Sequence, residues 1–262
     1  MRGSGTANRS AMEKVGELHA LVLREMTDLS TPSHRFKIVL DYLLLNNFLD
    51  LMNVQTSLSA APRRRLKTDV RQREIVAAVL VLACERGPDA ITTQAIADRM
   101  DVTQGALFRH FPDKEAIWLA VFVWVRESLG AVFVQATERP ASPLAKIKAA
   151  FLAHVAFVAA NPGVPRIMFH ELQYPGDSPV RAEVRAMITN YRKHLARLFT
   201  QAKAAGELPT GLDPTLAPIL FIGAVQGLVI QSALAGDEAR MMKRARQLLP
   251  LLLDGYRGQE KK

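Results

Sequence analysis

Apolar residues recur at steps of three and four positions along most of the chain, which is the period of an amphipathic helix. Over residues 70–86, for example, Ile75, Val79 and Leu82 share one helical face. Strand-like alternation bounded by Asn-Gly or Asp-Gly turns is absent, and Gly and Pro fall between the periodic segments. The pattern therefore predicts an all-α fold.

The predicted helices divide the chain into three parts, namely residues 1–62, 63–117 and 118–262. The middle part holds three helices, of which the first spans residues 70–86 and is followed by Gly87-Pro88. A long fourth helix then leads into a helical body. The helices expected from there on span residues 114–137, 143–160, 164–173, 179–205, 213–235 and 237–256.

Residues 1–62 form an N-terminal extension to which the sequence assigns no chemistry. It contains an apolar run over residues 36–52 and a linker-like segment over residues 57–62. Two interpretations have equal weight. Either the extension is a genuine, partly disordered extra helical segment, or the natural protein starts at Met52 and residues 1–51 are a mis-called start.

The segment over residues 92–111 has the features of two short helices joined by a tight turn. A threonine stands at the start of each short helix and can cap its free amides. Asp101 tolerates a left-handed backbone conformation within the three-residue turn. The second short helix is predicted over residues 104–110, because Phe111 precedes a proline and so avoids the helical region. Together with the longer helix before it, the segment forms a helix-turn-helix.

The last helix of this unit buries Leu107 and turns most of its other side chains outward. Gln104 can bond the edge of an adenine, and Ala106 can touch a thymine methyl group in the major groove of DNA. The candidate DNA-binding residues of the helix-turn-helix are Thr92, Thr93, Gln94, Thr103, Gln104, Gly105, Ala106, Phe108, Arg109, His110 and Lys114.

About a dozen positions in this region stand at fixed spacing, in the run Thr92-Thr93-x-x-Ile96-Ala97-x-x-Met100-x-Val102-Thr103-x-Gly105-x-Leu107-Phe108-x-His110-Phe111-x-x-Lys114. This run resembles the DNA-binding signature of TetR-type (TetR/AcrR) transcriptional regulators, and the resemblance covers roughly residues 70–120. It implies a DNA-binding head tied by its fourth helix to a helical body that binds a ligand and forms a dimer. Two positions depart from the family pattern. Asp101 stands where the family often has Gly, and Phe108 stands where it often has Tyr, so one hydroxyl contact to phosphate is lost.

The charge balance permits an acidic partner without choosing one. The chain has 34 Lys and Arg against 25 Asp and Glu, a net charge of +9. The helix-turn-helix is not basic, since residues 71–117 hold six basic and seven acidic residues. DNA affinity must then come from a few placed cations and from a basic arm before the first helix, for which a solvated linker is the alternative. The arm residues are Arg63, Arg64, Arg65 and Lys67.

The body carries no sharp motif, but it holds residue types that suit an effector cavity. His154 and His170 are candidate polar groups in an otherwise apolar pocket. Ordinary core packing is the alternative for each of these residues. The candidate pocket residues are Trp124, Phe151, His154, Phe157, Met168, Phe169 and His170.

Gly223 and Gly227 form a G-x-x-x-G step in an apolar helix, which lets a second helix approach closely. That second helix belongs either to the same chain or to a second copy of it. The family resemblance implies that the last two helices pair with their copies in a four-helix interface, and we expect this twofold dimer.

Enzymatic and metal-binding functions have no support in the sequence. The single cysteine, Cys84, cannot form an internal disulfide or a multi-cysteine zinc site, and it suits a reducing cytoplasm. His170-Glu171 begins like the H-E-x-x-H zinc motif, but Tyr174 stands where the second histidine is required. No Gly-rich phosphate loop or G-x-S-x-G elbow occurs. We expect no enzyme, no metal site and no cofactor.

One segment, residues 216–235, is about as long and as apolar as a membrane span. It contains Pro218 and two glutamines, and we interpret it as a buried helix of a soluble, cytoplasmic protein.

These observations predict a homodimeric transcriptional regulator. We expect it to be a repressor that binds a palindromic operator in double-stranded DNA and is released by a small-molecule effector. Two alternatives stay open: a constitutive DNA-binding or architectural protein without an effector, and a helical adaptor that binds proteins.

Overall fold

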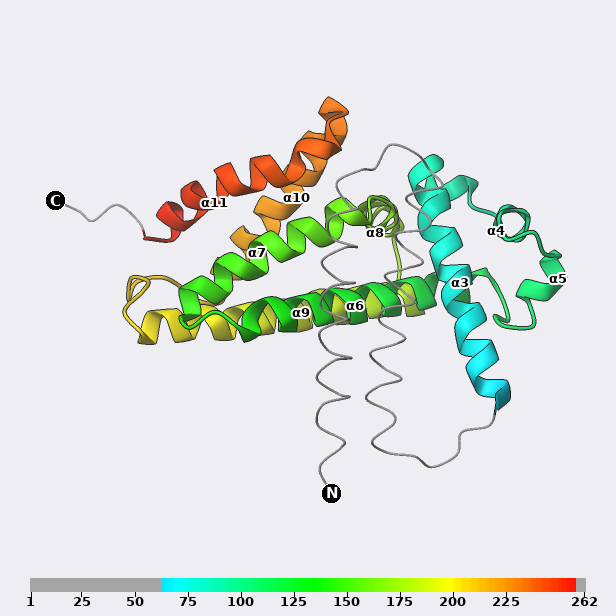
Figure 1. Cartoon of the computed structure of the whole chain (residues 1–262), viewed down its shortest axis with the longest axis horizontal. Coiled ribbons are helices and arrows are strands. Elements are labelled where there is room, and N and C mark those ends of the chain that lie inside the picture. The colour runs from blue at the N-terminus through cyan, green and yellow to red at the C-terminus, as the bar shows by residue number, and fades with distance from the viewer. Residues whose placement is uncertain (1–62, 258–262) are drawn as a thin grey trace, which may run out of the picture. The chain divides into compact units, whose positions relative to one another are not determined.

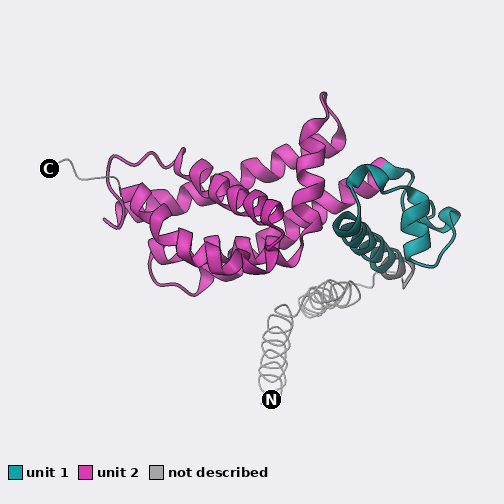
Figure 2. Ribbon diagram, turned by 90° about the horizontal axis from the view of Figure 1, so that it is seen from above, with its two compact units in different colours: residues 1–114 teal, residues 115–262 magenta. Residues whose placement is uncertain are grey.

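The computed structural model describes residues 63–257 of the chain (Figure 1). Within this range the protein is all-α and contains no strand, which confirms the predicted fold class. The two interpretations of residues 1–62 concern a segment outside the described residues. The chain divides into two compact units, residues 1–114 and residues 115–262 (Figure 2).

The first unit contains α3 (Arg63–Glu85), the short η1 (Pro88–Ala90), α4 (Thr93–Arg99) and α5 (Gln104–Leu107). The predicted start of the first helix at residue 70 was wrong. Arg and Lys are good helix formers and a proline directly precedes them, so the basic arm forms the first turns of α3.

The predicted end of the third helix at residue 110 was also wrong, because α5 ends at Leu107. The amides of His110 and Phe111 both donate to the carbonyl of Leu107, at 2.9 and 3.0 Å. The chain thus forms a turn and leaves the helix before Pro112. This is expected because Phe111 precedes a proline, and the helical conformation is disfavoured for such a residue.

The turn between α4 and α5 is built as expected around Asp101, whose φ of 54° lies in the left-handed region. The amide of Val102 donates to the carbonyl of Ala97 at 3.1 Å, and the amide of Asp101 donates to that of Asp98 at 3.3 Å. This pair of bonds is a Schellman motif, which satisfies the free carbonyls at the end of α4. The side chains of Thr92 and Thr103 then cap α4 and α5, accepting from the amides of Ala95 and Ala106.

Two polar contacts fasten the short helices to α3. Arg99 of α4 makes a paired bond with the carboxylate of Glu85, at 2.7 and 3.0 Å. The side-chain amide of Gln72 donates to the carbonyl of His110 at 2.9 Å. With Leu107 fully buried below them, these contacts hold α5 in a fixed orientation within the unit.

The second unit is a helical bundle. Its elements are α6 (Lys114–Glu138), α7 (Pro143–Ala160), α8 (Gly163–Gln173), α9 (Pro179–Ala204), α10 (Ala217–Ala235), η2 (Glu238–Arg240) and α11 (Met241–Arg257). Helix α7 packs against α9, α10 and α11, and Phe151, Phe199 and Phe221 are fully buried among them. The helix predicted over residues 213–235 begins only at Ala217, because the carboxylate of Asp213 accepts from the amide and hydroxyl of Thr215 in a turn.

Three described helices, α6, α7 and α10, have the length and hydropathy of a membrane span. In each, about two fifths of the most apolar window is buried inside the protein. Helix α6 also carries Arg126, which donates to Glu183 of α9 at 2.6 Å. Part of the apolar surface of these helices is thus used for packing within the bundle.

Candidate functional site

The candidate recognition surface lies on α5 and the turn after it. Gln104, Gly105 and Arg109 are exposed, and the ring of Phe108 is 44% exposed. A single exposed apolar side chain is common on protein surfaces, and here it adds an apolar contact site to an otherwise polar surface. Ala106 is half-buried, so its methyl group is only partly presented.

Gly105 has open space around it. A side chain added at this position would meet no described atom within 4 Å, and its backbone does not need a positive φ. Neither packing among residues 63–257 nor backbone conformation therefore explains the glycine. Its lack of a side chain allows another molecule to approach the backbone of α5 closely.

The polar residues of this surface differ in whether their side chains already form hydrogen bonds within the protein. The amide of Gln104 donates to the hydroxyl of Thr93 at 2.5 Å and so links α5 to α4. The amide of Gln94 donates to Asp98 at 2.6 Å. Arg109, by contrast, makes no hydrogen bond or ion pair with another described residue.

His110 faces the interior more than the sequence predicted. It is half-buried, its carbonyl accepts from Gln72, and its ring atom Nδ1 is buried without a hydrogen-bond partner among residues 63–257. Its helical periodicity was misleading because α5 has already ended at this point.

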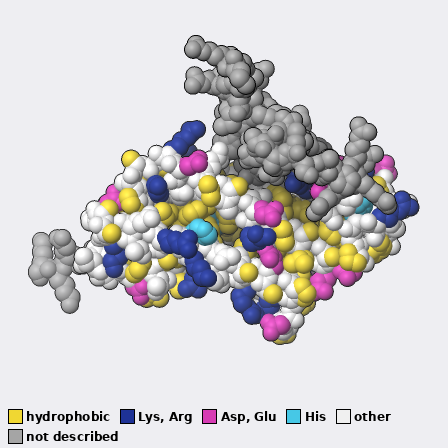
Figure 3. Space-filling view, turned by 90° about the horizontal axis from the view of Figure 1, so that it is seen from below, with side chains coloured by type: hydrophobic (Ala, Val, Ile, Leu, Met, Phe, Trp, Pro, Cys, Tyr) yellow, Lys and Arg dark blue, Asp and Glu magenta, His cyan; other side chains and the backbone are white. Residues whose placement is uncertain are grey.

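The candidate cations are few. The backbone of residues 63–67 is helical, and their side chains lie outside the described part of the structure. Lys114 is half-buried at the first turn of α6. On the molecular face seen in Figure 3, basic and acidic side chains are interspersed.

The second unit contains a cavity of about 110 Å³. It lies among α6, α7, α8, α9 and α10, and its lining is almost entirely apolar. Of the predicted pocket residues, His154, Phe157, Met168 and Phe169 line it. Trp124, Phe151 and His170 do not, since they pack elsewhere in the bundle. Further lining residues include Leu129, Val164, Leu172, Tyr191, Val225 and Gln226.

Tyr191 is the main lining residue that sequence reasoning missed. It follows Val184 and Met187 and precedes Leu195 on the buried face of α9, at steps of three and four. A tyrosine at such a step is enclosed and must find a partner for its hydroxyl group. That signal was present in the sequence.

The partner of Tyr191 is His154, whose Nδ1 lies 3.1 Å from the Tyr191 hydroxyl. The two rings meet edge to face at 5.2 Å, and His154 also stacks on Phe221 at 6.4 Å. Burial lowers the pKa of His154 to about 4, and burial raises the pKa of Tyr191. Both groups are therefore neutral at pH 7.

Acidification should destabilise the bundle through His154. Its pKa falls from 6.5 to about 4 on folding, so between these values the unfolded chain binds a proton that the folded chain does not. Stability is complete above about pH 6.5 and is lost as the pH falls toward 4. From pH 7 to pH 4.5 the loss should be about 2 kcal/mol in the free energy of unfolding.

Denaturant unfolding at both pH values measures this loss. His154→Gln should remove about 2 kcal/mol of the pH dependence, whereas His194→Gln, at an exposed position of α9, should leave it unchanged. An equal pH dependence in wild type and His154→Gln would contradict a neutral, buried His154.

Helix α8 contacts both the cavity and the beginning of α6. Met168 and Phe169 line the cavity, while the neighbouring His170 stacks on Trp118 of α6 with ring centroids 6.4 Å apart. His170 also meets the ring of Tyr174 at 4.8 Å, and their polar atoms lie 3.2 Å apart. A shift of α8 would thus change the surroundings of the first turns of α6.

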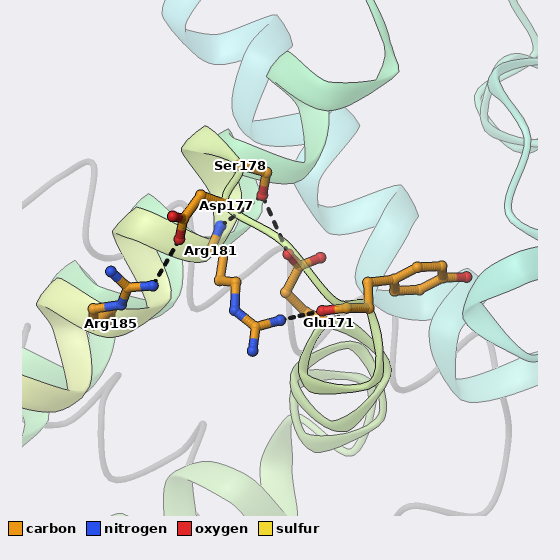
Figure 4. A network of polar contacts seen from close by, with 6 residues as sticks. Glu171, Asp177, Ser178, Arg181 and Arg185 are labelled. Atoms are coloured by element: carbon orange, nitrogen blue, oxygen red, sulfur yellow. Dashed lines mark hydrogen bonds and ion pairs between the residues drawn. The ribbon is translucent and has the colours of Figure 1, made fainter.

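A polar network fixes the turn between α8 and α9 (Figure 4). The hydroxyl of Ser178 accepts from the amide of Arg181 and donates to Glu171 of α8 at 3.4 Å. The guanidinium of Arg181 donates to the carbonyl of Tyr174, and Arg185 pairs with Asp177 at 2.9 Å. The C-terminal end of α8 is therefore tied to the start of α9.

One face of α10 is apolar and exposed. Ile219, Leu220, Ile230 and Leu234 share a stripe at helical spacing, and Leu234 is 78% exposed. Gly223 and Gly227 lie in the middle of this stripe and are exposed. A side chain added at either glycine would meet no described atom within 4 Å, so packing among residues 63–257 does not require them.

Among the described residues no cluster of three or more His, Cys, Asp and Glu side chains lies close enough to hold a metal ion. Cys84 is half-buried on α3, and its thiol donates to the carbonyl of Leu80 at 3.2 Å.

A helix-turn-helix unit followed by a helical bundle that contains a cavity is the architecture of a DNA-binding transcriptional regulator. Two family profiles match the chain. The profile "Bacterial regulatory proteins, tetR family" matches residues 75–121, and "Tetracyclin repressor-like, C-terminal domain" matches residues 175–249. The chain belongs to the TetR family of transcriptional regulators. The family is non-enzymatic, in agreement with the prediction that the protein is not an enzyme.

Similar proteins are known by sequence and by structure. The nucleoid occlusion factor SlmA of Vibrio cholerae is 24% identical over 159 residues, 60% of this chain and 81% of that protein. The transcriptional regulator FadR from Bacillus subtilis, solved with stearoyl-CoA, has a TM-score of 0.60 at 20% identity and covers 70% of this chain and 97% of its own. The ketosteroid regulator KstR2 of Mycobacterium tuberculosis has a TM-score of 0.59 at 20% identity, covering 72% and 96%.

Proposed function

We propose that this protein is a homodimeric repressor that binds a palindromic operator and releases it when a small molecule enters the cavity of the second unit. The observation that carries this proposal is the cavity itself. A largely apolar hollow with a few convergent polar groups is the usual form of a small-molecule site. The protein would act in the cytoplasm, where its DNA and its effector meet.

The exposed face of α10 supports the dimer. Helix-sized apolar stripes are costly to leave in water, and two central glycines allow the backbones of two copies to approach closely. In the sequence, intrachain packing was the alternative use of these glycines. The open space around both of them favours the use between copies.

A twofold dimer also suits the recognition surface. Two recognition helices must lie about 34–36 Å apart to enter successive major grooves on one side of the DNA. Each would present Gln104, Phe108 and Arg109 to the groove. The basic first turns of α3 would meet phosphate, which both their charge and the positive end of the helix dipole attract.

The proposed coupling between the cavity and the DNA-binding unit depends on α8. This helix lines the cavity and contacts the beginning of α6, which follows the helix-turn-helix directly in the chain. FadR, a relative in fold, was solved with stearoyl-CoA, so regulators of this fold do bind small molecules. A ligand that shifts α8 would move the part of α6 that leads to the DNA-binding unit.

Two variants distinguish recognition of the DNA base sequence from general affinity for DNA. Gln104→Ala should weaken the operator by about 1–3 kcal/mol with little loss of non-specific binding, because Gln104 reads base edges. Lys114→Ala should weaken all DNA sequences alike and reduce the salt dependence, because Lys114 meets phosphate. Titration of operator and unrelated duplexes at several salt concentrations measures both effects.

Gln135→Ala, an exposed glutamine of α6, is the matched control and should change neither affinity. The role of Gln104 would be refuted by an equal loss on both kinds of DNA. Such a loss would instead point to the bond between Gln104 and Thr93 and to the geometry of the two short helices.

The two alternatives from the sequence fare differently. The hypothesis of a protein-binding adaptor required the family resemblance of residues 92–114 to be accidental. Because the family profile matches residues 75–121, this hypothesis has no remaining support. Constitutive DNA binding without an effector differs from the proposal only in its response to ligand. Titration of the operator complex with candidate ligands measures this response.

A further inference from the structure

The lining of the cavity contains no charged side chain. Its three most polar groups are the imidazole of His154, the phenol of Tyr191 and the amide of Gln226, and the remainder is aliphatic, aromatic or methionine. A charged ligand group would leave water without meeting an opposite charge. Such a transfer is strongly unfavourable, whereas apolar groups gain from the same move.

Two of these three polar side chains, His154 and Tyr191, are held in fixed positions. The ring of Tyr191 meets the edge of Phe133 at 5.6 Å, and His154 stacks on Phe221, itself fully buried. Their mutual hydrogen bond uses Nδ1 of His154 and leaves Nε2 without a partner among the described residues. Whichever group donates in this bond, the pair retains one free donor and one free acceptor.

We propose that the cavity takes an uncharged, mainly hydrophobic molecule that carries a hydroxyl group or a similar donor–acceptor group, and that the His154–Tyr191 pair binds this group. The inference names the chemical class of the effector and in that respect rests on the proposed function.

A hydroxyl group matches the pair because it donates one hydrogen bond and accepts another. It therefore satisfies both free positions of the pair at once, whereas an ether or ketone satisfies one of them. The alternative for the pair is a purely structural bond between α7 and α9. The two roles differ in what they predict for ligands, because a structural bond has no preference among ligands of equal size.

The size of the cavity points to a small ligand body. An apolar cavity of about 150 Å³ binds benzene, and the cavity of this protein is about 110 Å³. It reaches the surface at Leu172 and Gln226, which are exposed, so a ligand can extend beyond it. Probes therefore start from a single ring. 4-Ethylphenol has the hydroxyl group, ethylbenzene lacks it, and 4-ethylbenzoate replaces it with a charge at pH 7.

Calorimetric binding to the full chain at pH 7 tests the proposal. 4-Ethylphenol should bind about 3- to 10-fold more tightly than ethylbenzene, the gain of a net hydrogen bond. 4-Ethylbenzoate should bind at least about 100-fold more weakly than 4-ethylphenol. Two larger matched pairs, 2-naphthol with 2-naphthoate and 1-decanol with decanoate, extend the comparison to longer ligands. Stearoyl-CoA serves as a charged probe of a different shape.

Tyr191→Phe should abolish the preference for 4-ethylphenol while leaving the affinity for ethylbenzene unchanged. Tyr256→Phe is the matched control. Tyr256 is buried in the same unit, its hydroxyl donates to the carbonyl of Ala217 at 2.9 Å, and it does not line the cavity. The ratio of the two affinities is insensitive to a general loss of stability, so Tyr256→Phe should retain the preference.

The proposal is overturned if no uncharged probe binds, if charged probes bind as tightly as their uncharged partners, or if Tyr191→Phe retains the preference. These results are independent of DNA. An uncharged probe that binds as expected but leaves operator affinity unchanged contradicts the effector function and supports the chemical class. Release of the operator by stearoyl-CoA with no binding of uncharged probes supports the effector function and overturns the chemical class.

Discussion

Replacement of both Ile230 and Leu234 by Glu is expected to make the protein monomeric and to weaken operator binding by about 10²- to 10⁴-fold. The two side chains are one helical turn apart on the exposed stripe of α10, where they are 44% and 78% exposed. Glutamates at these positions would bury charge in the proposed four-helix interface without meeting an opposite charge. A monomer then loses the simultaneous contact with two half-sites, which is the source of this factor.

The stability of each chain should be nearly unchanged in this variant, because both positions face solvent in the single chain. Val134→Glu is the matched control, since Val134 is an exposed apolar residue of α6 away from the stripe. Sedimentation measures the mass, and a duplex with one half-site measures the intrinsic affinity of a single head. A double variant that stays dimeric and binds the full operator normally would remove α10 from the dimer interface.

A true effector is expected to change tryptophan fluorescence and to release operator DNA over the same range of concentration. Coupling between two such sites is typically 5- to 150-fold in affinity, and operator DNA must weaken effector binding by the same factor. The ring centroids of Trp124 and Phe157 lie 6.1 Å apart, and Phe157 lines the cavity. Trp118 stacks on His170 of α8. The two tryptophans of the chain thus report on different places in the bundle.

Variants with one tryptophan separate binding from its consequence. Trp118→Phe retains Trp124 and should report occupation of the cavity. Trp124→Phe retains Trp118 and should report a movement of α8 against the beginning of α6. A ligand that changes only the Trp124 signal, and leaves operator affinity unchanged, binds without acting as an effector. If a broad panel of ligands and cell extract never loosens the operator complex, constitutive DNA binding becomes the better interpretation.

The helix-turn-helix was predictable from sequence because it depends on local chemistry. Thr92 and Thr103 cap the helices that follow them, and Asp101 takes the left-handed conformation that its short polar side chain tolerates. The exact extent of α3 and α5 was not predictable in this way. The basic arm continues α3 because nothing interrupts its helical backbone, and α5 stops early at the turn formed by His110 and Phe111.

The cavity shows the limit of periodicity. The spacing on α9 places Tyr191 on the buried face, but no spacing brings it to His154, which precedes it by 37 residues. Phe151 and Phe157 are both buried residues of α7, yet only Phe157 lines the cavity. The packing of five helices decides which buried side chains meet a void, because voids arise between elements and not within them.

The sequence alone determined the all-α class, the position of most helices and the presence of a helix-turn-helix, since helical periodicity, caps and turns act within a few residues. The tertiary structure decided which apolar surface is left uncovered and which polar groups are enclosed. The sequence allows Gly223 and Gly227 to pack either inside the chain or between copies, and the open space around them favours the proposed packing between copies. The desolvation that lowers the pKa of His154 likewise comes from helices distant in sequence, because Tyr191 of α9 and Phe221 of α10 pack against its ring.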